Sequence, residues 1–182
     1  PLVCEACLVC KEFCPEGAVV ADDRKAGEWF ESETRFGPMV HAYLGIAQEN
    51  SGKLVYQVRK VAAETAARQG LDKVIVDGPP GIGCSVIASI TGADIVVAVT
   101  EATLSGLSDL FRVYDLADHF RIPLRVIINK ADLNPEVTEK IKEWGHENNV
   151  KIMGEIPYDP AVSKAMVSGK AIVEVKDSKL TR

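Results

Sequence analysis

The 182-residue chain lacks several features that would place it in a broad class at once. It has no run of roughly 18 apolar residues, so we expect no membrane-spanning helix. Its formal net charge of −5 is opposite to the basic surface that is typical of nucleic-acid-binding proteins. Its first residues have neither the basic start nor the long apolar run of a signal peptide. These absences predict an ordinary globular protein of the cytoplasm.

Cysteine is scarce outside one short segment. Four of the five cysteines lie within eleven residues of one another: Cys4, Cys7, Cys10 and Cys14. An odd number grouped so tightly does not fit a secreted disulfide framework, so we interpret the group as metal ligands in a reducing compartment. Their spacing, C-x2-C-x2-C-x3-C followed by proline, is the bacterial ferredoxin pattern for a [4Fe–4S] cluster.

The ferredoxin spacing also predicts an incomplete site in this chain. The fourth cysteine of such a run binds the other cluster in two-cluster ferredoxins, so Cys14 is expected to serve a second cluster. The remaining ligands are expected upstream of Pro1, where a longer protein would continue. Structural zinc is the alternative, but zinc sites usually pair two short knuckles across a longer spacer. The fifth cysteine, Cys84, is expected to be a small buried residue. The alternative is a reactive thiol at a helix start, just after a glycine loop.

The composition changes near residue 50. Residues 1–23 form the cysteine segment, and residues 24–50 form a connector with short strand-like runs. From residue 51 onward we predict strands at 71–77, 94–100, 122–130 and 150–157. Helices are predicted over 51–70, near 84–90, around 107–117, after an N-cap at Asn134, and over 160–168. Continuous apolar strands separated by amphipathic helices predict an α/β fold, with a mostly parallel sheet covered by helices on both faces.

A glycine-rich loop follows the first of these predicted strands. Asp77 ends the apolar run, where a carboxylate can hold Mg²⁺ directly or through water. Gly78, Pro79 and Gly81 follow it, and glycines allow backbone N–H groups to approach a phosphate closely. The structural alternative is an aspartate that only makes a turn. With the glycine and proline residues behind it, we favour the functional interpretation and take Asp77 as the candidate catalytic residue.

A second polar group follows the predicted strand 122–130. Asn129, Lys130 and Asp132 form an N-K-x-D pattern, in which the amide can pair with a purine and the lysine stem can stack on its ring. An Asx turn is the structural alternative. Polar residues end the other two strands as well, at Thr100–Glu101 and at Pro157–Asp159. Parallel sheets bind ligands at the carboxyl ends of their strands, so all of these groups are expected on one edge.

One part of a nucleotide site is absent. No G-x-x-x-x-G-K-[ST] motif occurs in the chain. The nearest sequence is Ser51-Gly52-Lys53-Leu54, which has Ala47 where the first glycine is required and no hydroxyl residue after the lysine. We interpret it as a helix start from which Lys53 reaches a phosphate.

With these motifs the chain resembles the prokaryotic MinD/ParA-type (Mrp-like) P-loop ATPases that carry an inserted ferredoxin domain. The resemblance rests on Cys4–Pro15 and on the segments 33–55, 74–100, 126–138 and 154–162. It implies that the chain begins within the second cluster motif. It also implies a partial ferredoxin segment over 1–23, the connector over 24–50, and a P-loop NTPase-like domain over 51–182 without its Walker A strand and loop.

The resemblance implies roles for matching residues. Asp77 would be the switch aspartate linked to Mg²⁺, and Gly78–Gly81 would sense the γ-phosphate. Asn129 would contact the base, bordered by the Pro157 region. The resemblance implies ATP, although the N-K-x-D pattern alone also suits GTP. It further implies a nucleotide-dependent homodimer.

Together these features predict an iron–sulfur protein that binds nucleotide, with an ATPase activity coupled to electron transfer, cluster delivery or redox sensing. One alternative is an Fe–S carrier whose nucleotide fold is only a scaffold. Another is a non-catalytic subunit whose P-loop comes from a separate polypeptide. The missing Walker A motif leaves it open whether this chain is an enzyme by itself, and the client protein or redox partner is not specified.

Overall fold

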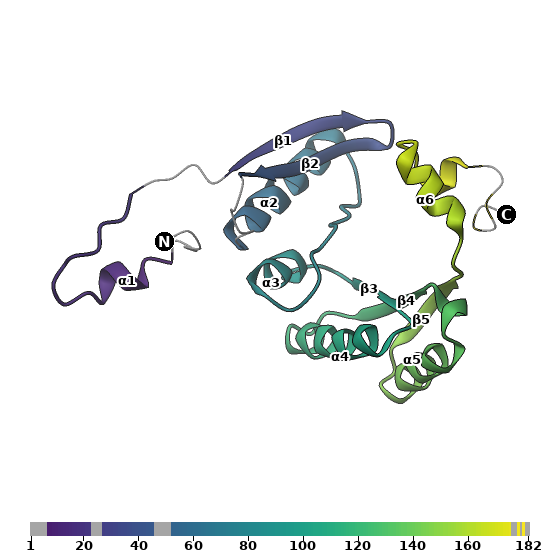
Figure 1. Cartoon of the computed structure of the whole chain (residues 1–182). Coiled ribbons are helices and arrows are strands. Elements are labelled where there is room, and N and C mark those ends of the chain that lie inside the picture. The colour runs from purple at the N-terminus through teal and green to yellow at the C-terminus, as the bar shows by residue number, and fades with distance from the viewer. Residues whose placement is uncertain (1–6, 23–26, 46–51, 176–177, 179, 181–182) are drawn as a thin grey trace. The chain divides into compact units, whose positions relative to one another are not determined.

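The chain forms two compact units, Pro1–Thr91 and Gly92–Arg182, in a computed structural model (Figure 1). The model describes residues 7–22, 27–45, 52–175, 178 and 180. Unit 1 contains a β-hairpin with helices, and unit 2 contains a parallel sheet with helices. The domain boundaries predicted near residues 23 and 50 stay predictions.

Unit 1 is built on an antiparallel hairpin. Strand β1 (Gly27–Thr34) pairs with β2 (Gly37–Leu44) along the whole length of both strands. Gly37 closes the turn with a φ of 118°, a backbone conformation that side chains with a Cβ rarely adopt. The Thr34 hydroxyl donates a hydrogen bond of 2.7 Å to the Gly37 carbonyl. The strand-like runs of the connector therefore form the two strands of a hairpin.

Helix α2 (Gly52–Gln69) packs against this hairpin. Its Thr65 hydroxyl donates to the Glu31 carboxylate over 2.8 Å, and Arg68 forms an ion pair with the same oxygen. Gly70 follows the helix with a φ of 69°, the left-handed conformation in which glycine commonly ends a helix. Ser51, the first residue of the predicted helix 51–70, lies outside the described residues.

A short helix, α3 (Cys84–Ile90), packs on α2. The Arg59 guanidinium donates from one nitrogen to the carbonyls of Ala88 and Thr91, both at 2.7 Å. These carbonyls lie at the end of α3, where no following helical turn supplies backbone N–H donors to them. Arg59 therefore ties the end of α3 to the middle of α2. The other described helix of unit 1 is the single turn α1 (Val9–Glu12) in the cysteine segment.

The strand predicted at 71–77 is wrong. Residues 71–79 pair with no described strand, and Ile75 is 95% exposed. A strand is stabilised by ladder hydrogen bonds and by side chains buried against neighbours. This segment has the apolar sequence of a buried strand but neither form of support among the described residues.

Unit 2 is the parallel α/β part of the chain. Its three strands are β3 (Val96–Glu101), β4 (Leu124–Asn129) and β5 (Lys151–Ile156), in the spatial order β3-β4-β5. Both pairs of neighbours are parallel. The strands predicted over 94–100, 122–130 and 150–157 are thereby confirmed, each with slightly different ends. A parallel three-stranded sheet fits a P-loop NTPase-like fold.

Two long helices connect these strands, α4 (Leu104–His119) and α5 (Pro135–Glu147). Asn134 caps α5 by accepting a hydrogen bond of 3.2 Å from the Val137 backbone, as predicted. A 3₁₀ turn, η1 (Ala131–Leu133), precedes this cap. The chain continues with α6 (Pro160–Val167), also predicted, and a second 3₁₀ turn, η2 (Ile172–Glu174).

The core of unit 2 lies between the sheet and helices α4 and α5. Val126 and Ile128 of the central strand are fully buried, as are Ala117 of α4 and Ile141 of α5. Trp144 packs on two aromatic rings of α4, so both helices lie on the same face of the sheet. On the opposite face, Val99 is 63% exposed. Within unit 2, the predicted cover on both faces is therefore seen on one face. None of the described helices has the combination of length and apolar character that a bilayer crossing requires.

Candidate nucleotide site

The carboxyl ends of the three strands of unit 2 meet at one edge. Glu101 at the end of β3 is the register partner of Asn129 at the end of β4, and Asn129 is the partner of Ile156 on β5. The predicted base-recognition residues therefore lie between two neighbouring strand ends. This is the edge at which open parallel sheets bind ligands.

The end of β4 has an unusual backbone. Lys130 has a φ of 54°, in the left-handed region that residues with a Cβ rarely occupy. The Asn129 side-chain oxygen accepts a hydrogen bond of 3.1 Å from the Lys130 backbone N–H. The Ala131 carbonyl accepts one of 2.8 Å from the Thr138 hydroxyl of α5. The N-K-x-D segment is thus held in one conformation by local contacts.

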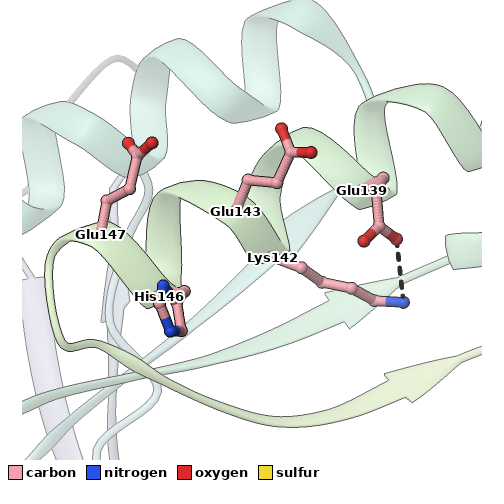
Figure 2. A pocket seen from close by; sticks show the side chains of 5 residues that line it. All are labelled: Glu139, Lys142, Glu143, His146 and Glu147. Atoms are coloured by element: carbon pink, nitrogen blue, oxygen red, sulfur yellow. Dashed lines mark ion pairs between the residues drawn. The ribbon is translucent and has the colours of Figure 1, made fainter.

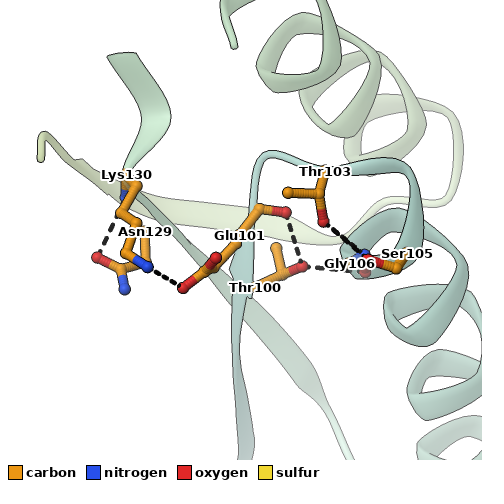
Figure 3. Close-up of polar contacts among 7 residues, drawn as sticks. All are labelled: Thr100, Glu101, Thr103, Ser105, Gly106, Asn129 and Lys130. Atoms are coloured by element: carbon orange, nitrogen blue, oxygen red, sulfur yellow. Dashed lines mark hydrogen bonds and ion pairs between the residues drawn. The ribbon is translucent and has the colours of Figure 1, made fainter. Parts of the chain in front are cut away.

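Lys130 also contacts the neighbouring strand end. Its ammonium nitrogen lies 2.6 Å from a carboxylate oxygen of Glu101 (Figure 3). Both side chains are partly exposed, at 38% and 47%. The sequence places Glu101 at a strand end but assigns it no role, because nothing in its local sequence indicates that it contacts Lys130.

Asp132 connects β4 with the segment after β5. One of its carboxylate oxygens accepts a hydrogen bond of 2.6 Å from the Tyr158 backbone N–H. Pro157, beside Tyr158, is exposed, and Asp159 caps α6 by accepting from the Ala161 N–H at 2.8 Å. Unit 2 therefore brings Asn129, Lys130, Asp132 and the Pro157 region together.

The other predicted nucleotide residues belong to unit 1. Asp77 and Gly78 are exposed, and Pro79 and Gly81 are partly buried. Gly78 packs so closely on α3 that a Cβ there would lie 3.1 Å from the Ser89 hydroxyl. Gly81 has a φ of 92°, which only glycine adopts readily. The loop after Asp77 thus has one glycine packed on α3 and one with a positive φ, and it follows a segment that pairs with no described strand. Its contact with a phosphate stays a prediction.

The start of α2 lies beside the start of α3. A Cβ on Gly52 would be 3.1 Å from the Cys84 carbonyl oxygen, so the first turns of the two helices are in contact. Lys53 lies in the first turn of α2, as the predicted helix start requires. Its contact with a phosphate stays a prediction.

The cysteine segment is partly described. Cys4 lies outside the described residues, Cys7 and Cys10 are exposed, and Cys14 is partly buried. The Ala18 backbone N–H donates to the Cys14 sulfur over 3.4 Å, and this hydrogen bond lowers the pKa of the thiol below its usual value, against a smaller opposing effect of burial. Within the described ranges, no three His, Cys, Asp or Glu side chains converge on a metal position.

The expectation that Cys84 is buried is wrong, because its side chain is exposed. Cys84 is the first residue of α3, whose buried residues are Val86, Ser89 and Ile90. At about 100° per residue, these three point to the opposite side of the helix from Cys84.

A shallow hollow of about 510 Å³ lies elsewhere, along α5 (Figure 2). Five α5 residues line it: Glu139, Lys142, Glu143, His146 and Glu147. Lys142 pairs with Glu155 at 2.8 Å and with Glu139 at 3.5 Å, and the Glu155 contact raises the pKa of the lysine. The hollow contains no predicted site residue and gives no support to the nucleotide assignment.

No family model matches the chain. An uncharacterized protein of Methanocaldococcus jannaschii is 26% identical over 181 residues, which is 100% of this chain and 60% of that protein. The sporulation initiation inhibitor protein Soj of Bacillus subtilis is 28% identical over 128 residues, or 64% of this chain and 50% of Soj. An uncharacterized ATP-binding protein of M. jannaschii is 27% identical over 106 residues, or 55% of this chain and 38% of that protein.

The chain spans about 60% or less of the length of these relatives. The parallel sheet of unit 2 fits a P-loop NTPase-like fold, and the similarity to these relatives is distant. They give no support to an inserted ferredoxin domain.

Proposed function

We propose that the chain is the nucleotide-binding part of a MinD/ParA-like ATPase. The observation that carries this proposal is the network at the sheet edge of unit 2, where the Asn129–Asp132 segment is linked to the ends of both neighbouring strands. Similarity to a protein described as ATP-binding supports the same function. Because relatives are longer than this chain, hydrolysis is proposed for the whole protein.

The base site would use the side chains at the end of β4. The Asn129 oxygen already accepts from the Lys130 backbone, and its amide nitrogen can donate to a purine ring nitrogen. The aliphatic stem of Lys130 offers an apolar surface to the face of the ring. These roles make the edge of unit 2 a purine site.

We take ATP as the ligand because a relative of the chain is described as ATP-binding. The N-K-x-D pattern also suits GTP. One Asp132 oxygen accepts from the Tyr158 N–H at 2.6 Å, and the carboxylate keeps further acceptor positions for the adjacent N–H donors of guanine. GTP is therefore the alternative ligand.

For unit 1, taken by itself, we propose a phosphate-binding role for the loop that follows Asp77. Asp77 would hold Mg²⁺ directly or through water, and the Gly78–Gly81 backbone would approach the γ-phosphate. Mg²⁺, when bound, neutralises phosphate charge during transfer. The exposed carboxylate and the glycine at a positive φ fit this role.

We further propose that the cysteine segment holds iron–sulfur clusters, with Cys4, Cys7 and Cys10 on one cluster and Cys14 on another. The supporting observation is the Cys14 thiol, whose pKa is lowered by the Ala18 N–H. Iron in such clusters is bound by thiolates, and a lowered pKa favours that form. Nucleotide state would then be coupled to electron transfer, cluster delivery or redox sensing, with a homodimer and a protein client as partners. A cluster carrier with an inactive nucleotide fold is the second candidate.

Calorimetric titration of the anaerobically purified chain with Mg-ATP and Mg-GTP tests the nucleotide proposal. We expect ATP to bind more tightly than GTP, and Asn129→Ala to weaken ATP binding by about tenfold, as for one lost hydrogen bond to a ligand. Asn148→Ala, at the end of α5, is the matched control. A folded chain that binds neither nucleotide would overturn the proposal for this chain. Iron and sulfide analysis with an electron paramagnetic resonance spectrum of the reduced protein tests the clusters separately.

A further inference from the structure

The contact between Glu101 and Lys130 links two parallel strand ends through side chains. Glu101 ends β3 and Lys130 follows β4, and 2.6 Å separate their charged atoms (Figure 3). The two residues are 29 positions apart in the chain. Neither side chain is deeply buried, so ordinary packing does not account for the contact.

The backbone of Glu101 is held in place from the other side. Its carbonyl accepts from the Thr103 N–H at 2.8 Å, and a Cβ on Gly106 would lie 2.4 Å from the same carbonyl oxygen. The Thr100 hydroxyl donates to the Gly106 carbonyl over 3.0 Å. Strand β3 thus ends in a tight connection to the first turn of α4, and Glu101 projects from a fixed point.

We propose that Glu101 is a positioning residue that orders the Lys130 side chain for a purine ring. This inference rests on the proposed function. With its ammonium held by Glu101 and its backbone held by Asn129, Lys130 is fixed at both ends. Its four-carbon stem is then ordered before a ligand arrives, and a base that packs on it does not have to immobilise it.

A plain surface ion pair is the competing explanation. Exposed pairs of this kind contribute little to stability, because solvent and salt screen them. Glu136 and Lys140 on α5 form such a pair at 2.7 Å, with no predicted ligand residue beside it. A positioning role predicts that the two pairs differ in their effect on ligand binding, although their N···O distances of 2.6 and 2.7 Å are similar.

The test compares Glu101→Gln and Glu101→Ala with Glu136→Gln in the full chain. We expect the dissociation constant for Mg-ATP to rise about threefold to tenfold in both Glu101 variants, which is the effect of ordering one long side chain on binding. Binding of inorganic triphosphate, which has no base, should not change. Glu136→Gln should bind ATP as the unchanged protein does, and the thermal midpoint should move little in all three variants.

A second measurement needs no nucleotide. An amine-reactive ester should label Lys130 faster in Glu101→Ala than in the unchanged chain, as followed by peptide mass spectrometry, while Lys140 serves as the internal reference. Equal ATP affinity or equal Lys130 labelling in the variant and the unchanged chain would overturn the Glu101 role alone. An unchanged chain that binds no nucleotide would overturn the proposed function and this inference with it.

Discussion

Two apolar segments of similar composition differ in structure: one forms a paired strand and the other does not. Residues 124–129 form the central strand of unit 2, paired on both sides, with every second residue buried. Residues 71–77 have a similarly apolar sequence, and a candidate ligand-binding loop follows them. They nevertheless pair with no described strand. The difference shows that a strand is made by its neighbours as much as by its own residues.

The largest expected effect compares the two segments directly. Ile128→Ala removes a fully buried side chain from the central strand, so we expect unit 2 to lose about 2–5 kcal/mol of unfolding free energy. Ile75→Ala truncates a side chain that is 95% exposed, so we expect a change within about 0.5 kcal/mol.

The measurement is urea unfolding followed by tryptophan fluorescence. The chain has two tryptophans, Trp29 in unit 1 and Trp144 in unit 2. A Trp29→Phe background therefore reports on unit 2 for Ile128→Ala, and a Trp144→Phe background reports on unit 1 for Ile75→Ala. A loss at Ile75 as large as the loss at Ile128 would mean that residues 71–77 are buried against a neighbour in solution.

A smaller effect on stability is expected from replacing glycines, and it should differ between a tightly packed glycine and one with open space around it. Gly106→Ala places a Cβ 2.4 Å from the Glu101 carbonyl oxygen, which must force the end of β3 to move. We expect a loss of about 1–3 kcal/mol, as for other overpacked sites, together with weaker ATP binding. Gly83→Ala in unit 1 meets nothing within 4 Å and has an ordinary φ of −70°, so we expect a smaller loss, of about 0.5 kcal/mol, at this N-cap of α3. Equal behaviour of the two variants in thermal unfolding and ATP titration would contradict the tight connection at β3.

A still smaller effect on the stability of unit 2 is expected from the N-cap of α5. Asn134→Ala removes the acceptor of the Val137 N–H, and we expect a loss of about 1 kcal/mol. Asn134→Asp keeps the acceptor and should recover most of that stability. Circular dichroism during heating measures both. No difference between the alanine and aspartate variants would show that the cap contributes nothing.

The smallest expected effect is a pH dependence in unit 1. The hydrogen bond from Thr65, then that from Arg68, lowers the pKa of Glu31 below its ordinary value of 4.5. Because the folded-state pKa is the lower one, this contribution is present above about pH 4.5 and is lost as the pH falls through the folded pKa. Glu31→Gln should flatten that acid dependence, measured by urea unfolding at several pH values with Trp29 as the reporter. An unchanged slope would show that the contact between the hairpin and α2 does not persist in solution.

Much of the fold follows from local patterns. Two helix ends follow local signals: α5 begins after the predicted cap Asn134, and α2 ends before Gly70, which has a positive φ. The strands of unit 2 lie within a few residues of the predicted ranges, because apolar runs between amphipathic helices suit a parallel sheet. The wrong predictions, for residues 71–77 and Cys84, concern the surroundings of a residue, which its local sequence does not contain.

The candidate site divides in the same way. The residue types of the Asn129–Asp132 and Asp77–Gly81 segments, and the spacing of the cysteines, are properties of the sequence alone. Residue chemistry and short-range backbone preferences depend on near neighbours in the chain, so the sequence determined them. The contacts of Glu101 with Lys130 and of Asp132 with Tyr158 join residues more than 25 positions apart. Only the parallel pairing of three strands brings these pairs together, so the tertiary structure decided them.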